Sequence, residues 1–401
     1  MVYQVFRYCP SNGVVVDWIL MKKISYLLLL LIFILNSTYV YAQTIEFWNN
    51  ASDGFRSQGR VRLGQAAPSP SVINPYQADN QLAKLYQDRV GESIEKLMGD
   101  LKTRIVLVSS DRQIVHQSFA TNSMRKATPL GFSMSKSITA LTVGHVLCAN
   151  PTISIDQRVD TLIPKLAGSS WGNSTIKDLL LMKSGAARQD PSRHGWQSEA
   201  VAVTHRPIYW GKHYSDFLDM MIKDDLKEFK PGTKHYYSNY DTLALGFVVE
   251  AISGKKFHEY FFNTIWREIS TANTGAWLVN SHDQTLTAYG FSASPEDWLR
   301  IGHYVVDQIR SNNCLGQFLK KAIEPVEHTH HSTRCYGFQI WNWCRTDTFF
   351  LMGNKDSFFF LGFGGQYLIV NPNKRWVAYV HQISHENDSQ LIFLLRTVMN
   401  L

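Results

Sequence analysis

Long runs of like charge are absent from this chain of 401 residues, and their absence narrows the classes of partner. No block of five or more Lys and Arg residues occurs, although Lys and Arg number 40 against 33 Asp and Glu. Proteins that bind nucleic acids usually concentrate positive charge in such blocks. The net charge of +7 is mild for this length, and we therefore expect no nucleic-acid partner.

An apolar segment long enough to cross a membrane is also missing near the N-terminus. The apolar stretch at residues 24–35 is shorter than the ~20 residues that a spanning helix needs. It follows two lysines and precedes the small residue Ala42, which is the pattern of a secretory signal peptide. We predict that residues 1–20 are an upstream extension and that residues 21–42 are a signal peptide. Cleavage near Ala42 would leave an exported protein, periplasmic or secreted, without a stable membrane span.

Cysteine is scarce, and none of its spacings matches a metal site. Signal cleavage would remove Cys9, which leaves an even number of cysteines in a compartment that permits disulfides. These are Cys148, Cys314, Cys335 and Cys344. Their pairing stays open. However, if the segment YGFQIWNW is one strand, the two cysteines that flank it lie about 30 Å apart and cannot bond to each other.

The order of strand-like and helix-like segments predicts the fold. Hydrophobic residues make up 45% of the chain and charged residues 18%, which allows a large buried core. RIVLVSS and QIVHQSF, separated by Asp111 and Arg112, are typical of a hairpin. YGFQIWNW, SFFFLGF, QYLIVNP and RWVAYVHQI are strand-like segments near the other end, and the middle is mainly helical. We expect an α/β fold of the α+β kind, with one antiparallel sheet built from both chain ends and flanked by helices.

The expected domain organisation follows from this order. We predict an N-terminal arm at residues 43–85 and a single domain at 86–401. The α/β part of that domain would comprise residues 86–135 and 333–401. Residues 136–332 would form an inserted, mainly helical subdomain.

The stretch GFSMSKSITAL, which begins at Gly131, raises the question of catalysis. Ser133 precedes Lys136 by three residues at the start of a helical segment, so the two share one helix face while Ser135 points elsewhere. A serine hydroxyl needs a base beside it, and a lysine can serve when burial lowers its pKa. Taken alone, the spacing also fits a helix-capping serine followed by a surface lysine.

Two later segments complete a pattern of three motifs. KHYYSNYDTLALGFVVEAISG places Tyr237 and Asn239 at the start of a helix, and FFFLGFGGQYLIVNP places Phe363-Gly364-Gly365-Gln366 between strand-like runs. In order and spacing, residues 90–400 resemble the serine β-lactamase and penicillin-binding-protein superfamily. They are most similar to its class C β-lactamase-like branch of esterases, D-aminopeptidases and 6-aminohexanoate-dimer hydrolases. TISIDQRVDTLIPKL, TIKDLLLMKSGA, FKPGTKHYYSN and LTAYGFSASPEDWLRIG match the same branch in this order.

The resemblance implies a β-lactamase-like serine hydrolase that forms an acyl-enzyme and needs no metal or organic cofactor. Ser133 matches the acylated serine, and Lys136 matches the lysine that accepts its proton or keeps the base deprotonated. Tyr237 matches the general base and proton donor to the leaving group. Asn239 matches the asparagine that binds a substrate carbonyl or holds the lysine. Oxyanion stabilisation would come from the backbone N–H groups of Ser133 and Gln366.

The third motif departs from that of β-lactamases, which carry Lys-Thr-Gly or His-Thr-Gly. Here Phe363-Gly364-Gly365, or residues 362–364 in the neighbouring register, offer neither a charge nor a hydroxyl. No other cation is identifiable at this wall from the sequence. We therefore expect a small-molecule substrate that is an uncharged carboxylic ester or small amide. The alternatives are a β-lactamase, a D-amino-acid peptidase, or an inactive member that binds a peptide or cell-wall fragment.

Other candidate sites are less specific. The histidine-rich stretch EHTHHSTR lacks the helical spacing of metal ligands and is predicted to be an exposed loop. GFGGQ is followed by a strand rather than by Lys-Ser/Thr, which argues against nucleotide binding. Four aromatic residues fit either the substrate cleft or the core: Tyr209, Trp210, Trp341 and Trp343.

Overall fold

The computed structural model describes residues 46–57, 60–76, 102–187, 216–328, 334–343 and 356–383, with single residues between 77 and 101. The predicted signal peptide and upstream extension lie outside these ranges. The chain divides into two compact units, Met1–Asn49 and Asn50–Leu401. In the first unit, residues 46–49 are helical, and the description below concerns the second unit.

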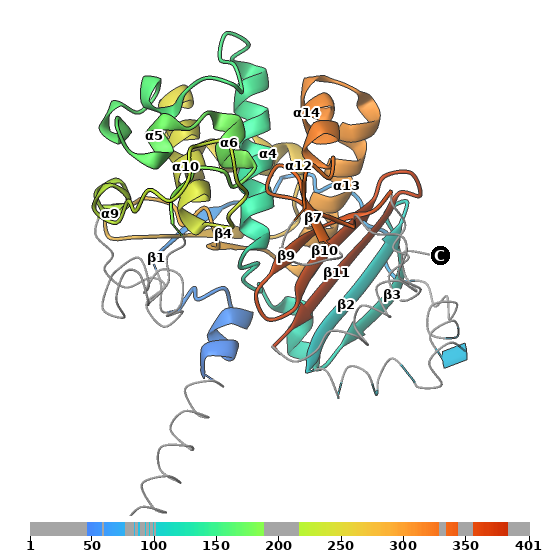
Figure 1. Ribbon diagram of the computed structural model, residues 1–401. Helices are drawn as coiled ribbons and strands as arrows, with labels where there is room; N and C mark the ends of the chain where they lie inside the picture. The colour runs from blue at the N-terminus through green and yellow to red at the C-terminus, as the bar shows by residue number, and fades with distance from the viewer. Residues whose placement is uncertain are drawn as a thin grey trace, which may run out of the picture. The chain divides into compact units, whose positions relative to one another are not determined.

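The large sheet is antiparallel and is built from both ends of the chain (Figure 1), as predicted. Its strand order among the described residues is β3-β2-β11-β10-β9-β8-β7-β6. The strands are β2 (Thr103–Ser110), β3 (Gln113–Phe119), β6 (Glu327–His328), β7 (Arg334–Tyr336), β8 (Trp341–Trp343), β9 (Phe358–Gly362), β10 (Gln366–Asn371) and β11 (Trp376–Gln382). The N-terminal hairpin joins the C-terminal strands where Val108 of β2 pairs with Ala378 of β11.

The predicted hairpin of β2 and β3 is confirmed, and its turn has a clear backbone basis. Asp111 and Arg112 have φ angles of 47° and 66°. Positive φ at both central residues is the geometry of a two-residue type I′ turn, whose twist matches that of the flanking strands. Asp and Asn tolerate the left-handed region better than most residues. The turn therefore sets the register of the strand pair at the edge of the sheet.

The segment YGFQIWNW is two strands, so the prediction of one continuous strand is wrong. β7 ends at Tyr336 and β8 begins at Trp341, and the Gly337 N–H donates to the Ile340 carbonyl at 2.9 Å. Gln339 has a φ of 59°, which turns the chain back on itself. As a result, Trp343 lies opposite Arg334 in the antiparallel pair.

Because this segment is a hairpin, the separation of about 30 Å expected for the flanking cysteines of one continuous strand no longer applies. Cys335 pairs with Asn342 in the ladder, so the two ends of this segment lie side by side. Cys148 and Cys314 form a disulfide with each other. Cys335 is disulfide-bonded as well, and its partner therefore lies outside the described residues, as Cys344 does.

Helices pack against the sheet and form the inserted region. They are α4 (Met134–Ala149), α5 (Ser170–Asn173), α6 (Ile176–Leu180), α9 (Phe217–Lys223), α10 (Asn239–Ser253), α11 (Phe257–Asn263), α12 (Ile265–Ile269), α13 (Pro295–Ser311) and α14 (Cys314–Ala322). A second sheet has the order β1-β4-β5, with β1 at Arg60–Gly64, β4 at Gly275–Val279 and β5 at Phe291–Ser292.

α4 is the central helix of the domain. It contacts α10 and α14 on its flanks and β9 and β10 of the large sheet. In Figure 1 it stands between the group of α5, α6, α9 and α10 and the pair α13 and α14. Because neighbours cover it on nearly all sides, its buried positions are not confined to one stripe. The Cys148–Cys314 disulfide ties its C-terminal end to the start of α14.

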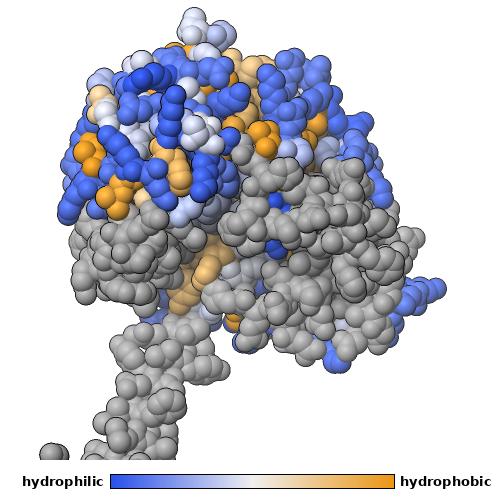
Figure 2. Space-filling view, viewed as in Figure 1, coloured by the Kyte–Doolittle hydropathy of each residue, from blue (hydrophilic) through white to orange (hydrophobic). Residues whose placement is uncertain are grey.

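The surface of the described residues is mostly hydrophilic in the view of Figure 2, with apolar residues scattered over it. The large apolar side chains that are exposed include Leu63, Val72, Val326 and Phe363. None of the helices described is both long and apolar enough to cross a bilayer.

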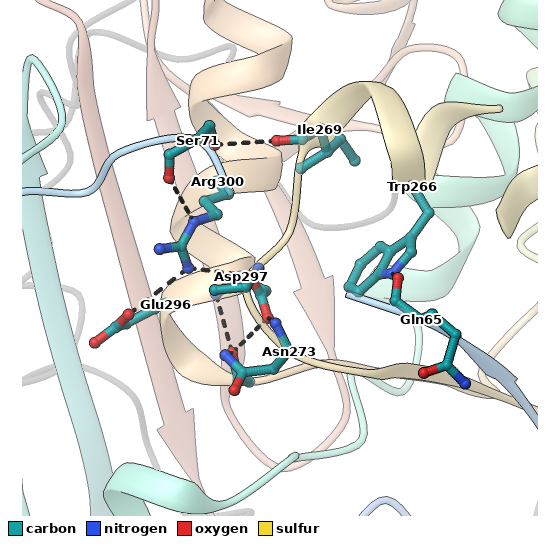
Figure 3. A network of polar contacts seen from close by, with 10 residues as sticks. Gln65, Ser71, Trp266, Ile269, Asn273, Glu296, Asp297 and Arg300 are labelled. Carbon is teal, nitrogen blue, oxygen red and sulfur yellow. Dashed lines mark hydrogen bonds and ion pairs between the residues drawn. The ribbon is translucent and has the colours of Figure 1, made fainter. Parts of the chain in front are cut away.

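Residues 60–76, which belong to the predicted N-terminal arm, are attached to the domain by a strand and by side-chain contacts (Figure 3). β1 pairs with β4, and the indole N–H of Trp266 donates to the Gln65 carbonyl at 3.1 Å. The Arg300 guanidinium donates to the Ser71 carbonyl at 2.9 Å, and the Ser71 hydroxyl donates to the Ile269 carbonyl at 3.0 Å. α12 therefore holds Gln65 and Ser71, and α13 holds Ser71 as well.

Asp297 is the buried anion of this network. Its carboxylate accepts from the backbone N–H groups of Ala272 at 2.8 Å and Asn273 at 3.0 Å, and from Arg300 at 3.0 Å. Ser294 caps α13 by accepting from the Asp297 N–H. A fully buried carboxylate is stable only when such donors replace its hydration.

We expect Asp297→Asn to lower the free energy of unfolding by on the order of 3 kcal/mol, because buried Arg300 then keeps only the exposed Glu296 carboxylate, at 3.6 Å. Denaturant unfolding measures this change. Asp307→Asn on the same helix is the control, since Asp307 is 40% exposed and pairs with Arg112 at the surface. That variant should lose less than about 1 kcal/mol. Equal losses in the two variants would contradict the assigned role of Asp297.

Candidate active site

Ser133 sits at the first turn of α4, where a strained backbone presents it. Phe132, directly before it, has a φ of 48°, which is unusual for a bulky residue. Such a conformation costs about 1–3 kcal/mol and persists only when packing enforces it. The Phe132 side chain is buried and its ring lies 5.7 Å from that of Phe363, while the Gly131 N–H donates to the Phe291 carbonyl at 2.8 Å. These contacts hold the turn that exposes Ser133.

The Ser133 hydroxyl does not cap the helix, although the residue occupies the capping position. Its oxygen instead accepts a hydrogen bond from Lys136 Nζ at 3.1 Å. Lys136 is 1% exposed. The alternative of a capping serine followed by a surface lysine is therefore wrong for this pair.

Three acceptors surround the Lys136 amine. Besides Ser133, Nζ donates to the Asn239 side-chain oxygen at 2.7 Å and to the Ala288 carbonyl at 2.8 Å. Burial lowers the pKa of Lys136 from 10.5 to about 7, because removal from water disfavours the ammonium form. A substantial fraction of the amine is therefore neutral at physiological pH. Sequence reasoning did not find the Ala288 carbonyl, because a backbone acceptor carries no residue-type signal.

Tyr237 lies on the other side of the same centre. Lys136 Nζ is 5.1 Å from the centroid of its ring, and the ring packs against Trp341 and Tyr336 at 5.8 and 5.9 Å. The alternative tyrosine, Tyr236, packs its ring against Phe229 instead. The structure thus brings the predicted serine, lysine, tyrosine and asparagine together.

Asp241 secures the start of α10, which carries the tyrosine and the asparagine. Its buried carboxylate accepts from the Ser184 hydroxyl at 2.6 Å and the Trp171 indole at 3.0 Å. Burial raises the pKa of Asp241 to about 7, and these donors partly offset that effect. This anchor fixes α10 against the loop that follows α6, and no motif in the sequence points to it.

A pocket of about 320 Å³ opens beside Ser133. Most of its lining is aromatic, apolar or glycine. The lining residues are Ser133, Tyr237, Arg334, Trp341, Leu361, Gly362, Phe363, Gly364, Gly365 and Tyr367. Gly364 and Gly365 have φ angles of 77° and 84°, and a Cβ on Gly365 would lie 2.1 Å from Gln382 Oε1. Glycine is therefore required at Gly365 for the turn that forms this wall.

Arg334 is a lining residue that no motif in the sequence predicts. The sequence identifies no cation at the third motif, and in the folded chain β7 adds Arg334 to the lining of the same pocket. The predicted triplet 363–365 does line the pocket, and Phe363 is 43% exposed there. The pocket lining is thus apolar at the turn between β9 and β10, and it includes a cation from β7, which β8 separates from β9.

Gln366 is placed differently from the other predicted residues. Its side chain is fully buried, with Nε2 donating to the Gln382 carbonyl at 2.6 Å and Oε1 bonded to His381 Nδ1. β10 lies between β9 and β11, so its backbone N–H groups point toward those strands. The pocket is bordered by residues 361–365 and Tyr367 rather than by Gln366.

The remaining candidates lie away from this centre or outside the described residues. Glu327 and His328 form β6 and pair with β7, so the prediction of a loop is wrong for them. His330 and His331 lie outside the described residues, as do Tyr209 and Trp210. Within the described part of the chain, no three His, Cys, Asp or Glu side chains are grouped as metal ligands would be.

Comparison with known families agrees with this geometry. The sequence model described as Beta-lactamase matches residues 94–391, which is most of the chain. The chain belongs to the β-lactamase family. It is therefore a β-lactamase-family serine hydrolase, which confirms the predicted resemblance and the predicted enzyme class at that level.

Individual relatives of this β-lactamase-family chain share parts of its sequence or its fold. A protein of Escherichia coli (strain K12) named "Putative D-alanyl-D-alanine carboxypeptidase" is 32% identical over 126 residues, which are 30% of this chain. The matched segment spans 27% of that protein's length.

Solved structures confirm the predicted fold. The structure named "Putative 6-aminohexanoate-dimer hydrolase from Bacillus anthracis" has a TM-score of 0.72 at 17% identity, over 87% of this chain and 92% of that one. A class C β-lactamase mutant has a TM-score of 0.58 at 16% identity, over 81% of this chain and 99% of that one.

The lowered pKa of Lys136 predicts how stability depends on pH. The folded-state pKa of about 7 lies below the value of 10.5 for an exposed lysine, so the unfolded chain binds more protons between these values. Relative to Lys136→Met, the wild type should gain about 1.4 kcal/mol of unfolding free energy per pH unit from about 7 to about 10. Denaturant unfolding of both proteins at several pH values measures this, and parallel pH curves would show that Lys136 is not desolvated.

Proposed function

We propose that this protein is an exported serine hydrolase that cleaves a carboxylic ester or small amide through an acyl-enzyme on Ser133. The observation that carries the proposal is the buried Lys136 amine, which has a pKa of about 7 and lies 3.1 Å from the Ser133 hydroxyl. A hydroxyl becomes a useful nucleophile only beside a group that can take its proton. A neutral amine in direct hydrogen-bond contact meets that need.

The proposed acylation step uses Ser133, Lys136 and Tyr237. Neutral Lys136 takes the proton of Ser133 directly, or it favours the phenolate of Tyr237, which then takes the proton. Ser133 Oγ bonds to the carbonyl carbon and forms a tetrahedral intermediate. The proton then passes through Tyr237 to the leaving oxygen or nitrogen as its bond to carbon breaks. Water, activated by the same base, later cleaves the acyl-enzyme.

The oxyanion would be stabilised by backbone N–H groups near Ser133. The Met134 N–H donates to the Gly131 carbonyl, and the Lys136 N–H donates to the Ser133 carbonyl. The Ser133 N–H takes part in neither of these two hydrogen bonds. We propose the Ser133 N–H as one donor. The sequence pattern suggests the Gln366 N–H as the second donor, but Gln366 is the first residue of β10, pairs with Gly362 of β9 and does not line the pocket, so the structure gives this donor no support.

Asn239 has a positioning role in this proposal. Its side-chain oxygen accepts from Lys136 Nζ at 2.7 Å, which supports the second of the two roles considered for it, that of holding the lysine. The amide then keeps the amine aimed at Ser133. Neutral Lys136 can still donate to Asn239 while its lone pair faces the hydroxyl.

A D-amino-acid peptidase is the second candidate, and Arg334 in the pocket favours it. Such a substrate carries a carboxylate that a guanidinium can bind. The name of the Escherichia coli relative points the same way, but its matched segment is short. A catalytically inactive binding protein is less compatible with the buried Lys136 beside Ser133, because keeping an amine out of water costs stability.

A fluorophosphonate probe tests the nucleophile. Wild type should be labelled, Ser133→Ala should not be labelled, and Ser135→Ala should retain labelling. Ser135 is fully buried and accepts from the Phe291 N–H at 3.0 Å, so its hydroxyl faces away from the pocket. Labelling that disappears in Ser135→Ala and persists in Ser133→Ala would reverse the assignment.

The reaction class is measured by kcat/KM for a p-nitrophenyl ester, a D-amino-acid amide, a linear amide and a chromogenic cephalosporin. We expect the ester or one of the two amides to have the highest value. A cephalosporin turned over most efficiently would replace the proposal with a β-lactamase.

Export is the second part of the proposal. The Cys148–Cys314 disulfide supports it, because such bonds persist mainly in oxidising compartments. We expect the mature protein from its native host to begin at or near Gln43. N-terminal sequencing measures this, and mature protein that retains residues 21–42 would contradict signal cleavage.

A further inference from the structure

We propose that Gln339 is a positioning residue, which joins the two helices that aim the Lys136 amine at Ser133. This inference rests on the proposed hydrolase function and adds to it a residue that lies in none of the three motifs. Gln339 is in the turn between β7 and β8, and its side chain is 1% exposed. It is not among the residues that line the pocket, so its effect on the reaction must pass through its neighbours.

Gln339 is hydrogen-bonded to both of these helices. Its backbone carbonyl accepts from the Ser137 hydroxyl on α4 at 2.6 Å, and its side-chain oxygen accepts from the Thr242 hydroxyl on α10 at 2.8 Å. Its side-chain nitrogen donates to the carbonyls of Leu179 at 2.9 Å and Leu180 at 3.3 Å, which end α6. One residue of the hairpin therefore joins α4, α6 and α10.

The partners of Gln339 lie next to the groups of the candidate site. Ser137 directly follows Lys136 on α4. Thr242 lies three positions after Asn239, so these two residues share one face of α10. The two helices are thus joined twice at this level, once by the hydrogen bond from Lys136 to Asn239 and once through Gln339.

The loop that supplies the third acceptor of Lys136 belongs to the same network. The Thr287 hydroxyl donates to the Thr242 carbonyl at 3.0 Å, and the Thr139 hydroxyl donates to the Thr287 carbonyl at 2.9 Å. Thr287 directly precedes Ala288, whose carbonyl accepts from Lys136 Nζ. These buried hydrogen bonds fix the loop to α4 and to α10, the helix that Gln339 holds.

Loss of the Gln339 side chain should therefore act on the Lys136 amine. Burial is the cause of the lowered pKa of Lys136, so helices that separate slightly would admit water and raise this pKa above about 7. The amine would also move relative to Ser133, and a misplacement of about 1 Å can reduce a rate by about a hundredfold. A loss of stability elsewhere in the fold would change neither the pKa of Lys136 nor the geometry of the folded molecules.

Matched variants test the proposal. Gln339→Met keeps the length of the side chain and removes its hydrogen bonds. Thr242→Val removes the hydroxyl that donates to Gln339, whereas Thr242→Ser retains a hydroxyl at that position. Ser109→Ala is the control, because it removes a buried hydroxyl that is bonded to His303 at 2.7 Å. Ser109 lies on β2, which β11 and β10 separate from β9 and the pocket wall.

The two measurements are the rate of fluorophosphonate labelling at Ser133 and the midpoint of the Lys136 side-chain NMR titration. The Lys136 resonance is identified by its absence from the spectrum of Lys136→Met. We expect Gln339→Met and Thr242→Val to slow labelling by about ten- to a hundredfold. Both should raise the titration midpoint by about one pH unit, the equivalent of one lost hydrogen bond. Thr242→Ser and Ser109→Ala should keep the wild-type midpoint and most of the labelling rate.

The proposal is overturned if folded Gln339→Met keeps the wild-type midpoint or is labelled as fast as Ser109→Ala. If Gln339→Met does not fold, either of these results in Thr242→Val overturns it instead. Failure of the proposed function would look different, because wild type itself would not be labelled at Ser133. The Lys136 titration would then still show whether Gln339 holds the amine in place.

Discussion

Removal of the Lys136 amine from water is the constraint on which the arrangement of the candidate site depends. The amine can remain buried only because acceptors from three parts of the chain replace its hydration: Ser133 on α4, Asn239 on α10 and the carbonyl of Ala288. The same burial lowers its pKa, so one structural condition both fixes the neighbours and prepares the amine to act on Ser133. Loss of any one of these acceptors would therefore shift the other two and also change the pKa of Lys136.

Supporting contacts surround this centre with further strained or buried groups. The left-handed Phe132 is held by packing against Phe363, so the wall turn and the serine turn brace each other. The raised pKa of Asp241 beneath α10 is a destabilising feature at neutral and alkaline pH, whereas the lowered pKa of Lys136 is one at neutral and acidic pH. The stability lost at Asp241 and at Lys136 is consistent with a site selected for chemistry rather than for maximal stability.

Local patterns in the sequence predicted what depends on short-range geometry. The three-residue spacing of Ser133 and Lys136 and the helix start at Asn239 were readable because helix periodicity and capping are local. The sheet built from both ends followed from strand-like segments at the two ends. Arg334 was missed because the contact between its strand and the pocket is long-range. The break between β7 and β8 was missed because Gln339 adopts a positive φ, which is not typical of glutamine. Gly337 was a partial signal of a turn at this place.

The pairing of β2 with β11 has a consequence for the order in which the protein can fold. A side-chain hydrogen bond from Ser109 to the Val377 carbonyl joins residues 268 positions apart, and the two strands pair along their whole length. The ribosome therefore releases β2 long before its partner exists, and until then that edge is open to incorrect pairing. The pocket wall at residues 361–365 also comes late in synthesis, whereas Ser133 and Lys136 come early. Catalytic competence therefore depends on the C-terminal strands, and a chain that stops before β9 would carry the serine and lysine without the wall that borders them.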